Sequence, residues 1–365
     1  MSVAFCISGH GFGHASRQVE VINAFGVLRP DTPVHVFTKA SRWLLDRTIT
    51  VPVSIVEQAV DSGAIQRDSL HLDVPATLSS AEQFEAGADA AAAALAREFR
   101  TRHIQVVVCD APPMPCTAAH LAGVPAVVLA NFTWDWIYED FSGEHPAYAE
   151  LPARLGRRYA QADAAWRLPM HGGFATFGTV LDFPWIARRS RRDRADVRRA
   201  IDATDSRPLV LISFGGYGVA NMTLAHHAGA PYRLVLSGGA EHSPDDAPAD
   251  ALHLDRERLD ALGLRYEDLV AAVDVVVSKP GYGIVSECVA NGTALLYTDR
   301  GRFREYPVMV DAMPQVLRCQ YIANASLAGN RWDVEIGELL AQPLAESRPL
   351  VNGADVAAGM LSAML

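Results

Sequence analysis

Three glycines and two histidines follow the first apolar run of the chain, and residues of these types can bind ligands or transfer protons. After Val3 to Ser8 the sequence reads Gly9-His10-Gly11-Phe12-Gly13-His14. Glycines allow a ligand to approach the backbone closely, and the N-terminus of a helix favours anions. An imidazole titrates near neutral pH, so either histidine could take a proton from a hydroxyl group. The pattern therefore predicts an anion site or a general base.

Asp110 is the residue expected to support such a base. It ends a later apolar run, Ile104 to Cys109, and the carboxyl ends of parallel strands meet at one edge of a sheet. A carboxylate that orients an imidazole makes it a better base, as in hydrolase triads. The alternative is that the Asp110 carboxylate only caps the chain before Pro112 and Pro113. From the residues alone, both interpretations stand.

The first glycine loop also has other interpretations. A dinucleotide site needs an acidic residue at the end of the second strand, but the chain has Phe37-Thr38-Lys39 there. His10 and His14 are four residues apart in a glycine loop, with no third ligand near in sequence, so we expect no metal. The structural alternative is a tight turn that one histidine caps.

Two further glycine loops follow apolar runs in the second half of the chain. They are Phe214-Gly215-Gly216-Tyr217-Gly218 and Ser278-Lys279-Pro280-Gly281-Tyr282-Gly283. Backbone N–H groups where the second loop enters a helix, with Lys279 beside them, suit a diphosphate. Glu287, in that helix, could accept hydrogen bonds from ribose hydroxyls. A polar loop, Asp299 to Pro307, could hold sugar hydroxyls or be solvated, and the glycine loops could be ordinary turns.

Alternating strands and helices must position these loops. Short β-branched runs alternate with helical patterns in both halves of the chain, which predicts βαβ units on parallel sheets. The pattern weakens between Trp166 and Arg194, where glycine, proline and arginine accumulate. We therefore expect an N-terminal α/β domain over 1–170 and a second over 171–345. A C-terminal helix within 346–365 is expected to pack on the first domain.

Composition narrows the functional classes. The formal net charge is -10, which argues against nucleic acid as a partner unless the cluster from Arg188 to Arg199 forms a basic groove. The five cysteines form no CxxC pair, which is typical of buried free thiols. The chain shows neither a signal peptide nor an apolar stretch long enough to span a membrane. We expect a cytoplasmic protein.

Taken together, these segments resemble the glycosyltransferase-like N-terminal region of L-arabinokinases and, more distantly, MurG-like GT-B glycosyltransferases. The matching segments run in the family's order. The resemblance covers residues 3 to about 310 and does not include the kinase half of L-arabinokinases, so sugar-kinase activity is not implied. The segments are Gly9 to Arg17, Asp61 to Gln66, Asn131 to Tyr138, Gly281 to Glu287 and, more weakly, Phe303 to Pro307.

The resemblance implies a GT-B fold, in which two Rossmann-like α/β domains face each other across a cleft. It implies an inverting transferase without cofactor or obligatory metal. His14 would be the base, because Gly13-His14 aligns best with the family's base position, and Asp110 would support it. The implied donor-side residues, with Glu287 on ribose and Glu305 on the sugar, are Gly215, Gly216, Lys279, Gly281, Tyr282, Gly283, Ser286, Glu287 and Glu305.

The acceptor would lie on the N-terminal domain, beside His10, Phe12, Arg17, Asp61, Gln66, Asn131, Trp134 and Asp135. Trp134, Trp136 and Tyr138 could stack on a sugar or flat acceptor, or they could be buried core aromatics. UDP is the expected nucleotide, with dTDP and GDP as alternatives. The acceptor is expected to be a small molecule or a glycan, and a homodimer is compatible with the sequence.

Two other functional classes remain open at this stage. A nucleotide-sugar epimerase or hydrolase would use the same donor loops without an acceptor. A non-catalytic accessory protein would bind a nucleotide sugar without turnover. The chain also departs from the family at Glu305-Tyr306, where many of these enzymes have Asp-Gln or Glu-Gln.

Overall fold

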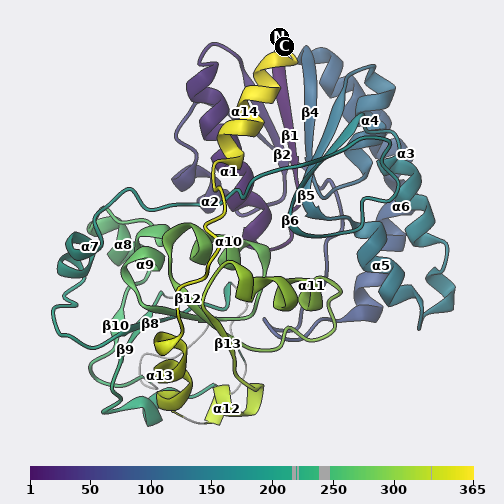
Figure 1. Ribbon diagram of the computed structural model, residues 1–365. Helices are drawn as coiled ribbons and strands as arrows, with labels where there is room; N and C mark the ends of the chain where they lie inside the picture. The colour runs from purple at the N-terminus through teal and green to yellow at the C-terminus, as the bar shows by residue number, and fades with distance from the viewer. Residues whose placement is uncertain (216–218, 220–221, 238–246, 330) are drawn as a thin grey trace. The chain divides into compact units, whose positions relative to one another are not determined.

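The chain divides into two compact units (Figure 1). The structure is a computed structural model, and it describes residues 1–365 except 216–218, 220–221, 238–246 and 330. Unit 1 comprises Met1–Ile65, Asp73–Ala187 and Leu350–Leu365. Unit 2 comprises Gln66–Leu72 and Arg188–Pro349. Each unit contains one sheet, so the prediction of two Rossmann-like α/β domains is confirmed.

Unit 1 is built on a seven-stranded parallel sheet with the strand order β3-β2-β1-β4-β5-β6-β7. Its central strands are mostly apolar and, apart from Gln105, buried, as expected for a parallel sheet covered on both faces. Ile7, at the end of β1, pairs with Asp110, at the end of β4. The strands are β1 Ser2–Ile7, β2 Val34–Thr38, β3 Ser54–Glu57, β4 Ile104–Asp110, β5 Ala126–Phe132, β6 Ala164–Gly172 and β7 Val180–Asp182.

The helices of unit 1 include one from the far end of the chain. Helix α14 packs on α1 (Figure 1), where Arg29 Nη2 donates to the Ser362 carbonyl at 3.0 Å. Asp73 caps the long helix α3 by accepting from the Ala76 N–H at 3.1 Å. The helices are α1 Gly11–Leu28, α2 Arg42–Thr48, α3 Val74–Thr101, α4 Met114–Ala122, α5 Trp134–Ser142, α6 Leu151–Tyr159 and α14 Gly353–Ala363.

Unit 2 has a six-stranded parallel sheet with the order β10-β9-β8-β11-β12-β13. The strands are β8 Leu209–Ile212, β9 Arg233–Leu236, β10 Leu252–His253, β11 Val275–Ser278, β12 Ala294–Tyr297 and β13 Cys319–Tyr321. The helices are α7 Arg194–Ala200, α8 Arg256–Ala261, α9 Tyr266–Ala272, α10 Tyr282–Asn291, α11 Glu305–Ala312, α12 Asn324–Gly329 and α13 Asp333–Ala341.

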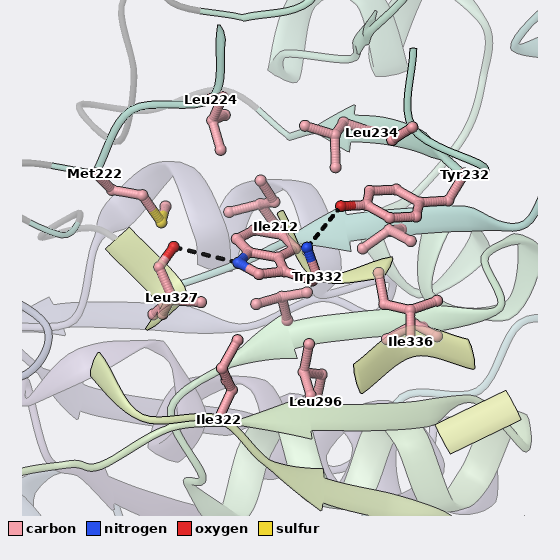
Figure 2. Packing of buried hydrophobic residues seen from close by; sticks show 14 of the residues in the cluster. Ile212, Met222, Leu224, Tyr232, Leu234, Leu296, Ile322, Leu327, Trp332 and Ile336 are labelled. Atoms are coloured by element: carbon pink, nitrogen blue, oxygen red, sulfur yellow. Dashed lines mark hydrogen bonds between the residues drawn. The ribbon is translucent and has the colours of Figure 1, made fainter. Parts of the chain in front are cut away.

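Trp332 lies at the centre of a hydrophobic cluster in unit 2 (Figure 2). Its indole N–H donates to the Leu327 carbonyl at 3.3 Å, and its backbone N–H donates to the Tyr232 hydroxyl at 3.1 Å. Leu70 belongs to the same cluster, and the Ser69 hydroxyl donates to the Phe214 carbonyl. These contacts explain why Gln66–Leu72 belongs to unit 2, although the sequence pattern placed it inside the first domain.

Residues 171–187 belong to unit 1, whereas the sequence pattern suggested the connection between domains there. Strand β6 runs to Gly172, and β7 pairs with it. The glycines that suggested a linker have packing reasons. A Cβ at Gly172 would lie 2.2 Å from the Trp136 ring, and one at Gly173, where φ is +93°, would lie 2.1 Å from Thr133 Oγ1. Close packing and backbone conformation thus require glycine at both positions.

No helix among the described residues is both long and apolar enough to cross a membrane.

Candidate functional site

The loop after β1 leads directly into α1 and carries both histidines. Gly11 has φ +66°, a conformation that favours glycine, and a Cβ at Gly9 would lie 3.1 Å from Lys39 Cβ. Backbone conformation therefore accounts for Gly11, and close packing accounts for Gly9. His10 precedes α1 and makes no side-chain cap, while His14 lies in the first turn with its side chain buried.

His14 and Asp110 are in contact. His14 Nδ1 lies 2.9 Å from Asp110 Oδ1, and Asp110 is completely buried. The pairing of β1 with β4 brings the two loops together, because Ile7 and Asp110 are opposite each other in the sheet. The structure thus brings together the two residues that the sequence predicted as base and support.

Arg17 completes this cluster. Its Nε donates to Asp110 Oδ2 at 2.8 Å, Nη1 donates to Asn131 Oδ1 at 2.7 Å, and Nη2 donates to Asp110 Oδ1. Burial is the largest single influence and would raise the pKa of Asp110, but the charges and hydrogen bonds of Arg17 and His14 together hold that pKa below its usual range. Asp110 is therefore an ionised carboxylate in a buried ion pair. The sequence predicted Arg17 only as an acceptor-side residue.

The ionised state of Asp110 determines the His14 tautomer. An ionised carboxylate only accepts hydrogen bonds, so the 2.9 Å contact requires the proton on His14 Nδ1. Arg17 Nη2 lies 3.0 Å from the same nitrogen, and both N–H groups converge on Asp110 Oδ1. The Nε2 atom of a neutral His14 then carries a lone pair and can accept a proton.

Asp61 lies in the same region of unit 1. The indole N–H of Trp134 donates to Asp61 Oδ2 at 2.9 Å. Burial raises the pKa of Asp61, although a hydrogen bond with Ser8, the charge of His14 and the bond from Trp134 act in the opposite direction. Trp134 is 1% exposed, so its ring packs in the protein.

His10 packs between this aromatic region and the next loop. Its ring centroid lies 5.9 Å from that of Trp134, and the Ala64 N–H donates to His10 Nδ1 at 3.4 Å. Gly63, with φ +63°, lies against it, because a Cβ there would be 2.8 Å from His10 Cβ. A neutral His10 that accepts at Nδ1 carries its proton on Nε2, the opposite tautomer from His14.

The remaining acceptor-side residues are more scattered. Phe12 is 37% exposed, and its ring contacts Trp43 edge-on at 5.6 Å between centroids. Asp135 accepts from the Trp136 N–H at 2.9 Å in the first turn of α5. Gln66 belongs to unit 2, where it forms a β-bridge with Leu72. Within unit 1, the hydrogen-bonded cluster therefore consists of His14, Arg17, Asp110 and Asn131.

In unit 2, Lys279 and Gly281 lie where β11 leads into α10. Gly281 is the N-cap residue and supplies no side-chain cap to the first N–H groups of this ten-residue helix. Burial and the charge of Arg300 lower the pKa of Lys279 to about 7, although Asp68 and Glu305 act in the opposite direction. Helix N–H groups beside a cationic side chain can bind an anion.

Arg300 lies over this helix start. A Cβ at Gly281 would lie 3.6 Å from Arg300 Nη1. The same nitrogen donates to the Pro280 carbonyl at 3.3 Å and to Glu305 Oε2. The guanidinium also stacks on Phe303, with 4.1 Å between its carbon and the ring centroid. Glu305, predicted to bind the donor sugar, is therefore buried and paired with Arg300.

Glu287 is also paired with an arginine. Arg188 Nε and Nη2 donate to Glu287 Oε1 at 2.7 and 2.5 Å, and the Arg188 guanidinium lies 5.1 Å from the Tyr266 ring centroid. Burial raises the pKa of Glu287, although Arg188 acts in the opposite direction. Two other predicted donor-side residues lie in the same helix, α10. Tyr282 is buried, and the Ser286 hydroxyl donates to the Gly283 carbonyl at 2.8 Å.

Sequence reasoning missed the roles of Arg188 and Arg300. Arg188 belongs to an arginine-rich segment and Arg300 to a polar loop. Neither pattern indicates a buried ion pair with a carboxylate. Of the first donor loop, Gly215 has φ +78°, and Gly216 lies outside the described residues. Among the described residues, no group of three or more His, Cys, Asp or Glu side chains is arranged to hold a metal ion.

No family model matches the chain. It is 29% identical over 369 residues to L-arabinokinase of Arabidopsis thaliana, a match that covers 98% of this chain and 34% of the relative. The chain thus spans about a third of the length of that relative, and the predicted resemblance to L-arabinokinase is confirmed.

Solved glycosyltransferase structures match the whole chain. The glycotransferase of kitacinnamycin has a TM-score of 0.64 at 15% identity, over 100% of this chain and 99% of that one. Phytolacca americana UGT2, complexed with UDP-2fluoro-glucose and pterostilbene, has a TM-score of 0.61 at 14% identity, over 100% and 94%. VinC, in complex with dTDP, has a TM-score of 0.59 at 14% identity, over 100% and 95%.

The chain has the GT-B fold. The predicted fold class is confirmed, because both halves are parallel-sheet Rossmann-like units and the similarity extends over the full length of this chain. Within this GT-B chain, His14 and Asp110 lie in unit 1, and Lys279, Glu287 and Glu305 lie in unit 2.

The arginine-rich segment of this GT-B chain forms ion pairs inside unit 2. Arg194 Nη2 and Arg198 Nη2 donate to the two oxygens of Asp274 at 2.6 and 2.7 Å. Arg192 Nη2 donates to the Gly263 carbonyl at 2.6 Å, and Arg188 is buried against Glu287. These contacts give the segment a structural role, since they tie α7 to the turn between α9 and β11.

Proposed function

We propose that this protein is an inverting glycosyltransferase that moves a sugar from a nucleotide diphosphate sugar to a hydroxyl or amine of an acceptor. The observation that carries the proposal is the contact between His14 Nδ1 and the ionised Asp110. It leaves His14 Nε2 as a proton acceptor in the first turn of α1. The GT-B fold supports the assignment of the reaction class.

In the proposed reaction, His14 Nε2 takes the proton from the acceptor hydroxyl. The acceptor oxygen then forms a bond to the anomeric carbon, and the bond from that carbon to the phosphate oxygen breaks. The nucleoside diphosphate leaves with the electron pair. Attack from the face opposite the leaving group inverts the anomeric configuration. The opposite tautomers favour His14 over His10 as the base, because His10 Nδ1 already accepts from the backbone.

Unit 2 is proposed to bind the diphosphate. The N–H groups at the start of α10 and the side chain of Lys279 would compensate the charge that develops on the leaving group. We propose that this charge compensation needs no obligatory metal, so turnover should survive a chelator. UDP and dTDP are the first nucleotides to test, because solved structures with this fold contain them.

The first test is a thermal-shift screen of the full chain with UDP, dTDP, GDP, ADP and NAD. A ligand at 100 times its dissociation constant stabilises a fold by about 2.7 kcal/mol, so a selective shift with one nucleoside diphosphate is the expected result. No shift with any nucleotide would argue against the donor site. A shift with NAD alone would instead support a dinucleotide site.

The second step incubates the protein with the selected nucleotide sugar, with and without a panel of small-molecule and glycan acceptors. A glycosylated product of inverted configuration is expected, and the His14→Ala variant should retain the nucleotide shift while losing turnover. Product from the donor alone would support an epimerase or hydrolase. Binding without any product would support a non-catalytic accessory protein.

A further inference from the structure

Ala111, the residue that follows Asp110, has a strained backbone. Its φ is +64°, in the left-handed region that residues with a Cβ atom rarely adopt. Ala111 is completely buried, and it lies where β4 ends, directly after the carboxylate that contacts His14. A strained backbone persists only where neighbouring groups hold it, and such strain is concentrated at functional sites.

The hydroxyl of Tyr159 holds the Ala111 peptide group. This hydroxyl accepts from the backbone N–H of Trp134 at 3.0 Å and donates its proton to the Ala111 carbonyl. Trp134 is the first residue of α5, and the first N–H groups of a helix have no partner within the helix. One hydroxyl therefore joins the end of β4 to the start of α5.

The environment of Tyr159 suits a fixed structural donor. The residue is completely buried, and its ring packs against Phe177 with 5.5 Å between the ring centroids. Burial raises the pKa of the Tyr159 hydroxyl well above its usual range, so the hydroxyl keeps its proton near neutral pH. Loss of the hydroxyl alone would leave a buried carbonyl and a buried N–H without this partner.

We propose that Tyr159 is a positioning residue of the candidate site, which holds Ala111 in the left-handed conformation and thereby keeps Asp110 against His14 Nδ1. Ala111 and Asp110 share a peptide group, so relaxation of Ala111 would reorient the end of β4. Arg17 also binds the carboxylate, but its long side chain can follow a displaced Asp110, whereas Tyr159 acts on the backbone. The proposal rests on the proposed function in one respect, namely that His14 is the base.

The test measures the His14 tautomer in the nucleotide-free protein labelled with 15N-histidine. Two-bond 15N–1H correlation spectra of the ring are recorded at about pH 9, where imidazoles are neutral, and His14→Gln assigns the signal. The unmodified protein should show the Nδ1–H tautomer, because Asp110 accepts that proton. In Tyr159→Phe, which keeps the ring, the ratio of the Nδ1–H to the Nε2–H tautomer should fall about tenfold, as expected for loss of a hydrogen bond to a charged group.

A second substitution separates positioning from general stability. Ala111→Gly removes the Cβ atom that makes a positive φ costly, so the left-handed conformation no longer needs the hydroxyl. The double variant Tyr159→Phe/Ala111→Gly should therefore recover most of the Nδ1–H tautomer. In the transferase assay, Tyr159→Phe should lower kcat about tenfold with the nucleotide Kd unchanged, and the double variant should regain kcat.

Tyr232→Phe is the matched control. The Tyr232 hydroxyl also accepts from a backbone N–H, that of Trp332 at 3.1 Å, and it lies in the core of unit 2. This variant should lose stability without any change in the His14 tautomer.

An unchanged tautomer ratio in Tyr159→Phe overturns the proposal, and so does a fall in the ratio that Ala111→Gly does not reverse. If Tyr159→Phe does not fold, recovery of folding by Ala111→Gly supports the proposal. Failure of both variants to fold would overturn it, because the hydroxyl would then serve the fold as a whole. The tautomer is measured without nucleotide, so its outcome is independent of the thermal-shift screen that tests the proposed function.

Discussion

Buried ion pairs determine which of the predicted site residues can interact with a ligand. Of the carboxylates that the sequence predicted to act, Asp110, Glu287 and Glu305 each contact an arginine. A charge that is paired inside the protein interacts weakly with a distant ligand group, but it holds its partner rigidly. The groups left to respond to a ligand are therefore His14, Asp61 and Lys279.

Lys279 should link nucleotide binding to pH. Its pKa is lowered to about 7, mainly by burial and next by Arg300, and a bound diphosphate would favour the charged form. Below pH 7 the lysine is already charged, so affinity should be constant. Above pH 7 binding must add a proton, so affinity should fall by up to about tenfold per pH unit.

The measurement is isothermal titration with UDP-glucose between pH 6 and 9, since a diphosphate diester does not titrate in this range. Lys279→Arg is the matched variant, because an arginine stays charged throughout, and its affinity should be independent of pH. A flat profile in the unmodified protein would show that Lys279 does not contact the ligand charge.

At the level of elements, glycines allow the aromatic helix α5 to pack closely against the end of β6. Gly172 lies against the ring of Trp136 and Gly173 against the side chain of Thr133, so a Cβ atom at either glycine would collide with these side chains. Thr133 is the residue that precedes α5, and Trp134 begins that helix. The position of Asp61 therefore depends on this packing, since Trp134 holds its carboxylate.

Gly173→Ala should destabilise the protein, because it combines a φ of +93° with a Cβ 2.1 Å from Thr133 Oγ1. We expect a loss of about 2 kcal/mol in the free energy of unfolding, measured by urea denaturation. The control is Gly178→Ala, where the new Cβ meets nothing within 4 Å. Equal stability of the two variants would contradict this account of the glycine.

At the level of the whole molecule, acid should weaken the fold through a buried histidine in unit 2. His227 is 2% exposed, and burial lowers its pKa to about 4 from a usual value of 6.5. Its Nδ1 lies 2.6 Å from the hydroxyl of Tyr232, which in turn accepts from the Trp332 N–H. Protonation would therefore disturb the core shown in Figure 2.

The sign of the effect follows from the two states. Between pH 6.5 and 4 the unfolded chain binds a proton at His227 that the native state excludes. The contribution of a neutral His227 to stability is therefore complete above pH 6.5 and is lost as the pH decreases toward 4. The slope for one proton is at most about 1.4 kcal/mol per pH unit. His227→Gln should therefore lose less stability than the unmodified protein between pH 7 and 5 in urea denaturation.

A parallel loss of stability in both proteins would assign the acid sensitivity to other groups, such as His35 and His171, whose pKa values burial also lowers. Asp110 acts at lower pH. Because Arg17 lowers the pKa of Asp110, that contribution is complete above the ordinary aspartate range and is lost only below it. The effects of Asp110 and His227 thus occupy different pH windows, and between pH 7 and 5 the difference between the two proteins reports on His227.

The strands were predictable wherever they are continuous β-branched runs. Such runs include Ile104–Asp110 and Val275–Ser278, and they specify buried parallel strands by composition alone. Strands β6 and β7 escaped prediction, because Ala164–Gly172 contains Arg167 and Pro169 and ends in glycine. The pairing of β6 with β5 and of β7 with β6 makes them strands, and that pairing is not encoded locally.

Local patterns in the sequence predicted the two α/β halves, the glycine loops at strand ends and the location of Asp110 at the same sheet edge as the histidine loop. These follow from local periodicity and from the rule that parallel strands end at one edge of a sheet. Only the tertiary structure decided that Arg17, Arg188 and Arg300 neutralise the predicted carboxylates and that Gln66–Leu72 belongs to unit 2. The reason is that an ion pair forms between whichever charges the packing brings together. Arg188 and Glu287 are 99 positions apart, so no local pattern in the sequence specifies their contact.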